Sequence, residues 1–199
     1  MDLITGLKSE LFRPLVTLFV PGAVAVGPYV LLARARVPEC ETFWTDHPVA
    51  FVSVVLISVL AAGLVLEDFG SRIEGSIWDR WLKARVSTFD QDWHIYLRLQ
   101  AHEEIVGQRY LRSILIRMKF ELSMAPALII HAIGLVWTNL GNSILDVYDL
   151  TVVVVILLAL AAYLLWESWT SAQLLVELRK DVIAACAKRD ALRESRPAT

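Results

Sequence analysis

Acidic side chains gather where two apolar stretches of this chain end, and they are the residues best placed to do chemistry. The cluster consists of Glu67, Asp68, Glu74, Asp79 and Glu167. Paired carboxylates at a membrane surface can hold Mg²⁺ or Ca²⁺, or serve as a general acid and base. They can equally cap membrane spans and form salt bridges with neighbouring cations such as Arg72 and Arg80. We favour the salt bridges, and we predict no catalytic residue, no metal site and no cofactor.

One ionisable residue, His131, lies well inside an apolar stretch. An ionisable group at membrane depth is expensive and is by default a functional candidate. A proton relay needs an acidic partner, and no acid lies at similar depth in the sequence. We therefore favour a neutral histidine that is hydrogen-bonded to a neighbouring helix, through a hydroxyl group or a backbone carbonyl.

Basic and apolar residues are interleaved just before the third apolar stretch. The basic members are Arg109, Arg112, Arg117 and Lys119. A basic amphipathic helix beside a membrane suits the anionic lipid headgroups of the inner leaflet. The same residues also satisfy the ordinary excess of positive charge on the cytoplasmic side, so a lipid-binding role and a purely topological role both remain open.

Other residues of metal-binding type do not form a recognised motif. The sequence His102-Glu103-Glu104 lacks the second histidine of a zinc protease, and Asp90 and Asp92 suit a turn and a helix cap. The chain has no nucleophile elbow, no phosphate-binding loop and no dinucleotide fingerprint. A net charge of −2 gives no reason to expect a nucleic-acid partner.

The elements that must position these residues are apolar helices. The chain is 56% hydrophobic and 20% charged, with a mean hydropathy of +0.54, which is too apolar for an ordinary soluble domain. Spanning a bilayer takes about 20 mostly apolar residues. Four stretches meet that requirement, and we predict transmembrane helices at residues 14–33, 48–67, 122–141 and 150–169.

The distribution of Lys and Arg predicts the orientation. The segment 68–121 holds nine of the 19 basic residues, and 142–149 holds none. Because basic residues stay on the cytoplasmic side, we place residues 1–13, 68–121 and 170–199 in the cytoplasm. The predicted location is the inner membrane of the cell. Residues 34–47 and 142–149 then form outer loops, which separates Cys40 from Cys186. Cleavage of the first stretch as a signal peptide is the less favoured alternative, because that stretch is long and contains Pro and Gly.

The cytoplasmic segments are predicted to be helical as well. The second span should continue inward, a further helix should run from about Trp93 to near Glu104, and Gly107 should break it. The tail should continue the fourth span. Its apolar residues follow a coiled-coil spacing at Leu175, Leu178, Val182, Ala185 and Leu192. We favour packing of this seam on the chain's own Trp78/Trp81 helix over an oligomer interface.

Small residues and prolines shape the first two spans. Glycine and alanine permit close helix contact, and the candidates are Gly22, Ala23 and Gly27 in the first span and Ser58, Ala61 and Ala62 in the second. Pro21 and Pro28 are expected to kink the first span.

The expected fold is an all-α integral membrane protein with four transmembrane helices and cytoplasmic helical extensions. We expect a non-enzymatic homo-oligomer in contact with membrane lipids, either a channel-like subunit or a membrane effector that responds to a cytoplasmic protein partner. The layout is similar, as architecture only, to small membrane proteins of bacterial stress or phage-defence systems. Two alternatives are a membrane anchor or assembly scaffold, and an enzyme acting on lipid headgroups through the acidic cluster.

Overall fold

The computed structural model describes residues 15–98, 106–142 and 145–194, and these residues form helices joined by short connections. The π-helical segments are labelled η. The elements are η1 (Leu15–Phe19), α2 (Val20–Arg36), α3 (Pro38–Asp46), α4 (Pro48–Ile73), η2 (Glu74–Trp78), α5 (Asp79–Arg85), α6 (Phe89–Arg98), α7 (Val106–Asn142) and α8 (Val147–Glu194). The described residues contain no strand, so the predicted all-α class is confirmed.

Four helices are long and apolar enough to cross a membrane, which makes the chain a multi-pass membrane protein. They cover Val16–Arg36, Pro48–Arg85, Tyr110–Leu140 and Val147–Lys188. Each overlaps one of the four predicted apolar stretches over nearly its whole length. Three of them continue well beyond the hydrocarbon thickness of about 30 Å, because a helix rises about 1.5 Å per residue. The predicted inward continuations of the second and fourth spans are therefore present as helix.

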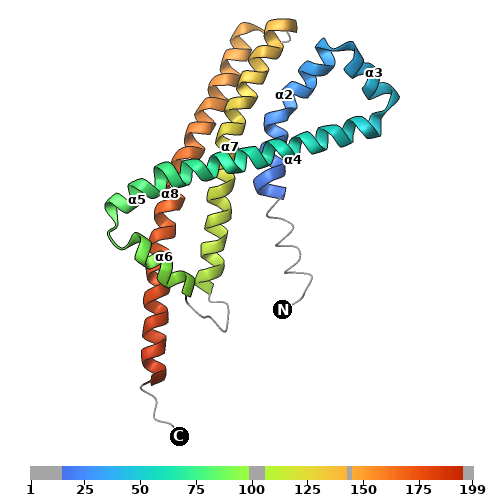
Figure 1. Cartoon of the computed structure of the whole chain (residues 1–199). Helices are drawn as coiled ribbons and strands as arrows, with labels where there is room; N and C mark the ends of the chain where they lie inside the picture. Colours follow the sequence, from blue (N-terminus) through green and yellow to red (C-terminus); the bar gives the residue numbers. More distant parts are fainter. Residues whose placement is uncertain (1–14, 99–105, 143–144, 195–199) are drawn as a thin grey trace.

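The helices are arranged around the antiparallel pair α7 and α8 (Figure 1). The helix α4 passes obliquely across α7, and α2 packs against both of them. The helix α3, the end of α7 and the start of α8 lie towards one end of the molecule, which we call the loop end (Figure 1). The helix α6 and the end of α8 lie towards the other end, which we call the charged end.

Two local elements differ from the sequence-based expectation. The helix α3 occupies much of the segment predicted as an outer loop, with Pro38 in its first turn, where a missing N–H costs nothing. Glu39 and Glu41 stabilise the same turn, because acidic groups complement the helix dipole there. The helix α6 begins at Phe89, earlier than the expected start near Trp93. Gly107 lies inside the first turn of α7, and residues 99–105 before it are outside the described residues.

Two glycines bring α4 into close contact with the η1–α2 segment. A Cβ atom added to Gly22 would lie 2.0 Å from the carbonyl oxygen of Val59, and one added to Gly63 would lie 2.1 Å from that of Leu18. The two backbones therefore touch directly, as in small-residue packing of membrane helices. Of the expected contact residues Gly22 takes part, whereas Gly27 has nothing within 4 Å of an added Cβ.

Three of the four long apolar helices are interrupted in their hydrogen-bonding pattern, and α8 is the exception. The segment η1 directly precedes Pro21, and Pro28 and Pro126 lie inside α2 and α7. The segment η2 contains Gly75, around which an added Cβ would find open space. Sites of this kind are where membrane helices bend, because proline and π turns leave backbone groups without their usual partners.

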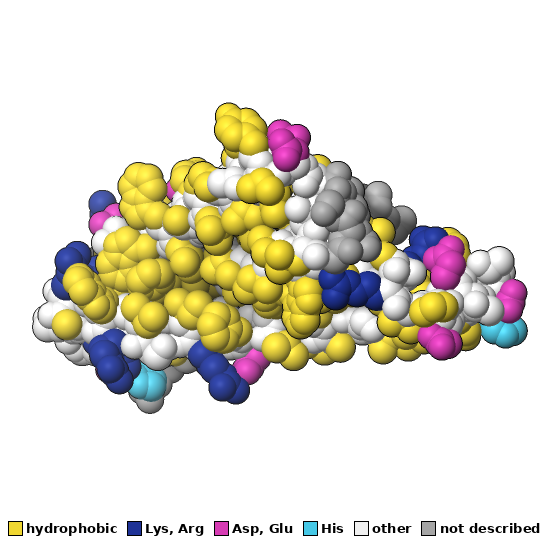
Figure 2. Space-filling view, turned by 90° about the horizontal axis from the view of Figure 1, so that it is seen from above, with side chains coloured by type: hydrophobic (Ala, Val, Ile, Leu, Met, Phe, Trp, Pro, Cys, Tyr) yellow, Lys and Arg dark blue, Asp and Glu magenta, His cyan; other side chains and the backbone are white. Residues whose placement is uncertain are grey.

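The largest buried cluster lies towards the charged end, beyond the apolar stretches. It consists of Leu82, Leu111, Ile114, Met118, Leu122, Ala172, Leu175 and Val176. By contrast, much apolar surface elsewhere is exposed, including Val49 (80%) and Val65 (69%) on α4. Apolar side chains dominate the surface seen from above (Figure 2). This distribution fits a protein whose spans face lipid and whose charged end packs like a soluble domain.

Candidate functional site

A layer of charged and hydroxyl side chains joins three helices where their apolar stretches end. We call it the charged layer. It consists of Ser71, Glu74, Arg117, Lys119, Glu121, Glu167 and Ser171. The residues come from α4, η2, α7 and α8. The layer therefore ties the three helices together at one level of the molecule.

Glu121 is the buried carboxylate of the charged layer. Glu121 is only 3% exposed to solvent. The Nε of Arg117 donates to its Oε1 at 2.8 Å, and the hydroxyl of Ser171 donates to its Oε2 at 3.2 Å. Arg117 also pairs with Glu167. A buried carboxylate that keeps a cation and a hydroxyl donor is compensated, so this group links α7 to α8.

Lys119 forms the second centre of the charged layer. Its Nζ donates to the hydroxyl of Ser71 at 3.0 Å and to Glu74 Oε2 at 2.5 Å. The two charged side chains are 21% and 22% exposed, so their pairing is screened less than a surface salt bridge. This centre links α7 to the α4–η2 helix.

The structure distributes the predicted acidic cluster over separate partners. Glu74 and Glu167 belong to the charged layer, and Asp68 forms an exposed pair with Arg72 at 2.9 Å. Glu67 is partly buried and forms no hydrogen bond or ion pair with the residues that the structure describes. Among the described residues no group of three or more His, Cys, Asp or Glu could hold a metal ion. The geometry favours structural salt bridges over a carboxylate pair that could bind a metal or act on a substrate.

Asp79, the remaining member of the cluster, faces a buried arginine that the sequence did not single out. Arg179 is 8% exposed, and its guanidinium lies 4.4 Å from the ring centroid of Trp93. Burial lowers the pKa of Arg179 and raises the pKa of Asp79, because each loses water that would solvate its charge. The nearby opposite charges partly offset both effects. The contact between Arg179 and Trp93 holds α6 against α8 outside the membrane-spanning segments.

His131 contacts the first span through its backbone. Its Nδ1 lies 2.7 Å from the carbonyl oxygen of Val24. Pro28 follows Val24 by four residues and has no N–H, so it leaves this carbonyl without its helical donor. A carbonyl only accepts, so Nδ1 carries the proton and donates it. The geometry is that of a histidine that completes the hydrogen bonding of α2.

Part of the predicted lipid-binding set is engaged inside the chain. Arg117 and Lys119 pair within the charged layer. Arg112 is exposed and also has an interaction within the chain. The side chain of Arg109 lies outside the described residues. The structure thus gives these residues a structural role, and headgroup binding by them stays a prediction.

The seam of the tail packs within the chain over its first half. Leu175 and Val182 are 5% and 6% exposed, and Leu178 packs against the main buried cluster. Ala185 is exposed, and the side chain of Leu192 lies outside the described residues. On the same helix, the ring of Trp169 lies 5.0 Å from that of Trp78. Leu175, Leu178 and Val182 are therefore used by the chain itself.

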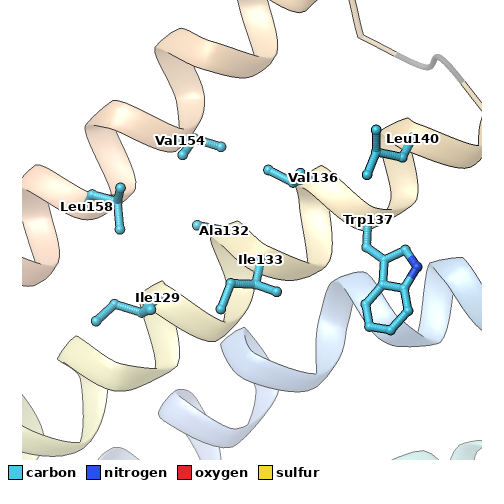
Figure 3. A pocket seen from close by; sticks show the side chains of 8 residues that line it. All are labelled: Ile129, Ala132, Ile133, Val136, Trp137, Leu140, Val154 and Leu158. Atoms are coloured by element: carbon cyan, nitrogen blue, oxygen red, sulfur yellow. The ribbon is translucent and has the colours of Figure 1, made fainter.

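An apolar groove runs between α7 and α8 towards the loop end (Figure 3). Its volume is about 390 Å³, and it is lined by Ile129, Ala132, Ile133, Val136, Trp137, Leu140, Val154 and Leu158. Only the Trp137 side chain carries a polar atom. Such a lining suits contact with hydrocarbon and offers no group for acid–base chemistry.

The charged layer therefore has the geometry of a mechanical connection between helices. Glu121, Arg179 and Gly63 are the main residues that sequence reasoning missed. No periodic pattern marks them, although an acid at the start of an apolar stretch and an arginine within an apolar seam were available signals. Comparisons with family models, curated proteins and solved structures find no match to this chain.

Proposed function

We propose that this protein is an oligomeric membrane effector in which a helical module at the charged end controls the arrangement of the spans. The observation that carries the proposal is the continuity of α7 and α8. They run for 37 and 48 residues from the apolar region into the buried cluster of the charged end. The helix α8 has no interior proline and no π turn, so it can pass a change at one end to the other as tilt or rotation.

The charged layer supports this proposal because it lies where such a movement would pass. Glu121 and Lys119 bind α7 to α8 and to the α4–η2 helix, respectively. Displacement of one helix therefore alters the hydrogen bonds of the other two. In this proposal a cytoplasmic protein partner acts on the module, and the layer carries the change to the spans.

The exposure of α8 supports self-association. Only 6% of its apolar stretch is buried within the chain, against 44% for α7. A single chain therefore offers α8 little protein surface in the membrane. A pore would also need several copies, because the apolar spans of one copy hold few polar groups to line it.

The test is native mass spectrometry of the full chain released from nanodiscs, followed by conductance recording in planar bilayers. A defined oligomer with conductance supports the channel-like form of the proposal. A defined oligomer without conductance supports the effector form. A strictly monomeric protein overturns the proposal.

One observation favours a second candidate, an assembly scaffold. The main buried cluster lies outside the apolar stretches and joins α5, α7 and α8. A scaffold would keep its function if unrelated spans replaced the native ones, whereas the effector would lose it. An enzyme acting on lipid headgroups has less support, because the carboxylates at this level are mostly paired. It would require that Glu67→Gln abolish activity while leaving the oligomer intact.

A further inference from the structure

A tryptophan-lined cleft lies between the η2–α5 segment and α8. Its volume is about 310 Å³. Four of the chain's seven tryptophans line it, together with one leucine and one arginine: Trp78, Trp81, Arg85, Leu165, Trp166 and Trp169. Trp81 is 54% exposed and Trp166 is 66% exposed, so the cleft is open to its surroundings.

We propose that this cleft binds a membrane phospholipid with an anionic headgroup. Arg85 supplies the charge. Its guanidinium lies 5.0 Å from the ring centroid of Trp81 and forms no ion pair with any residue that the structure describes. Its neighbour Lys83, by contrast, is paired with Asp90 at 2.9 Å. A guanidinium above an aromatic ring can still donate hydrogen bonds to a phosphate.

The position of the cleft selects a lipid rather than a soluble anion. Trp166 closes the apolar stretch of α8, and Glu167 follows it directly. Tryptophans concentrate at this level of a membrane, where one part of the ring meets hydrocarbon and the N–H meets headgroups. Leu165 and the exposed ring of Trp166 would contact the upper acyl chains while Arg85 contacts the phosphate. The site is separate from the charged layer and does not depend on the proposed effector function.

The experiment measures dissociation constants for dioleoyl phosphatidylglycerol and dioleoyl phosphatidylcholine on the full chain by native mass spectrometry. The wild type should bind the anionic lipid more tightly. Loss of one basic residue at a membrane surface corresponds to about fivefold in affinity. Arg85→Gln should therefore weaken phosphatidylglycerol by about that factor and leave phosphatidylcholine unchanged.

Arg80→Gln is the matched control, because Arg80 is an exposed arginine on the same helix that does not line the cleft. It should weaken phosphatidylglycerol clearly less than Arg85→Gln does and leave phosphatidylcholine unchanged. Trp166→Ala should weaken both lipids, since it removes the apolar contact. Equal effects of the two arginine variants, or equal affinity of the wild type for both lipids, would overturn the proposal. Circular dichroism of each variant verifies that the helices are retained.

Discussion

At the scale of single residues, this protein pairs polar groups that the apolar region would otherwise leave unsatisfied. Pro28 frees the carbonyl of Val24, and His131 donates to it at 2.7 Å. Glu121 is buried, and it is compensated by Arg117 and Ser171. In both cases a polar side chain that resembles a catalytic group is hydrogen-bonded to a neighbouring helix. Its contribution is therefore measured as a change in the free energy of unfolding.

We expect His131→Ala to lower the free energy of unfolding by about 1–3 kcal/mol, because it leaves the Val24 carbonyl unpaired. In a Pro28→Ala background the restored N–H can bond this carbonyl, so the same substitution should cost less. Denaturant unfolding in micelles, followed by circular dichroism, gives both values. If the destabilisation by the two substitutions together equals the sum of their separate effects, the hydrogen bond between His131 and the Val24 carbonyl is contradicted.

Glu121→Gln should destabilise the fold by about 1–3 kcal/mol, since it removes the charge that Arg117 faces at a buried position. Asp68→Asn is the control, because it breaks an exposed pair with Arg72 on one helix face. That change should cost less than about 0.5 kcal/mol. The same unfolding assay compares the two, and equal losses would show that burial of Glu121 is not what matters.

At the scale of helices, contact depends on where a side chain is missing. Gly22 and Gly63 bring the backbones of the η1–α2 segment and α4 together, and Gly70 brings α4 against Leu122 of α7, where an added Cβ would lie 3.1 Å from the Leu122 carbonyl carbon. Pro126 follows Leu122 by four residues and so frees that carbonyl. The path of α4 across its neighbours is thus set by glycines that face backbone.

Gly63→Ala should force η1 and α4 apart, because its Cβ would meet the Leu18 carbonyl, and overpacking of this kind costs about 1–3 kcal/mol. Gly27→Ala is the matched control in the first span, since it meets nothing and should leave stability unchanged or slightly higher. Thermal unfolding in nanodiscs measures both. Similar melting temperatures for the two variants would exclude direct backbone contact.

At the scale of the whole molecule, the loop end and the charged end differ in charge and packing. The charged end holds the main buried cluster, and the loop end holds α3, whose Glu41 pairs with Arg34 at 2.8 Å. The excess of basic residues predicts that the charged end faces the cytoplasm.

A maleimide that cannot cross membranes tests this orientation. We expect Cys40 to react in intact cells, because it is partly exposed on α3, whereas Cys186 is 4% exposed and should stay unreactive. Lys180→Cys in a Cys40→Ser background should react only after the cells are permeabilised, since Lys180 is exposed on the charged part of α8. The reverse pattern would invert the topology.

The sequence predicts the spans well because twenty consecutive apolar residues have few other uses. It predicts α3 poorly, since a nine-residue helix with no buried residue has no apolar periodicity, and its start signals at Pro38 and Glu39 are weak. A contact of His131 with a neighbouring helix could be predicted, but its partner Val24 and the contacts of Glu121 could not. They depend on how one helix is rotated against another, and spacing along a single helix does not determine that.

The π-helical turn at η2 has a consequence for which face of the chain meets α8. A π turn holds an additional residue, and each residue advances the direction of the side chains by roughly 100°. The π turn therefore rotates the side chains of Trp78, Leu82 and Arg85 by about one residue's angle from the directions that they would have in a regular α-helix continuing α4. A regular α-helix through the same residues would turn these side chains away from Trp169, whereas deletion of one residue from the π turn would leave their direction nearly unchanged. One additional residue, in a segment that contains no buried residue, thus determines how the side chains of the charged end are rotated relative to those of the second span.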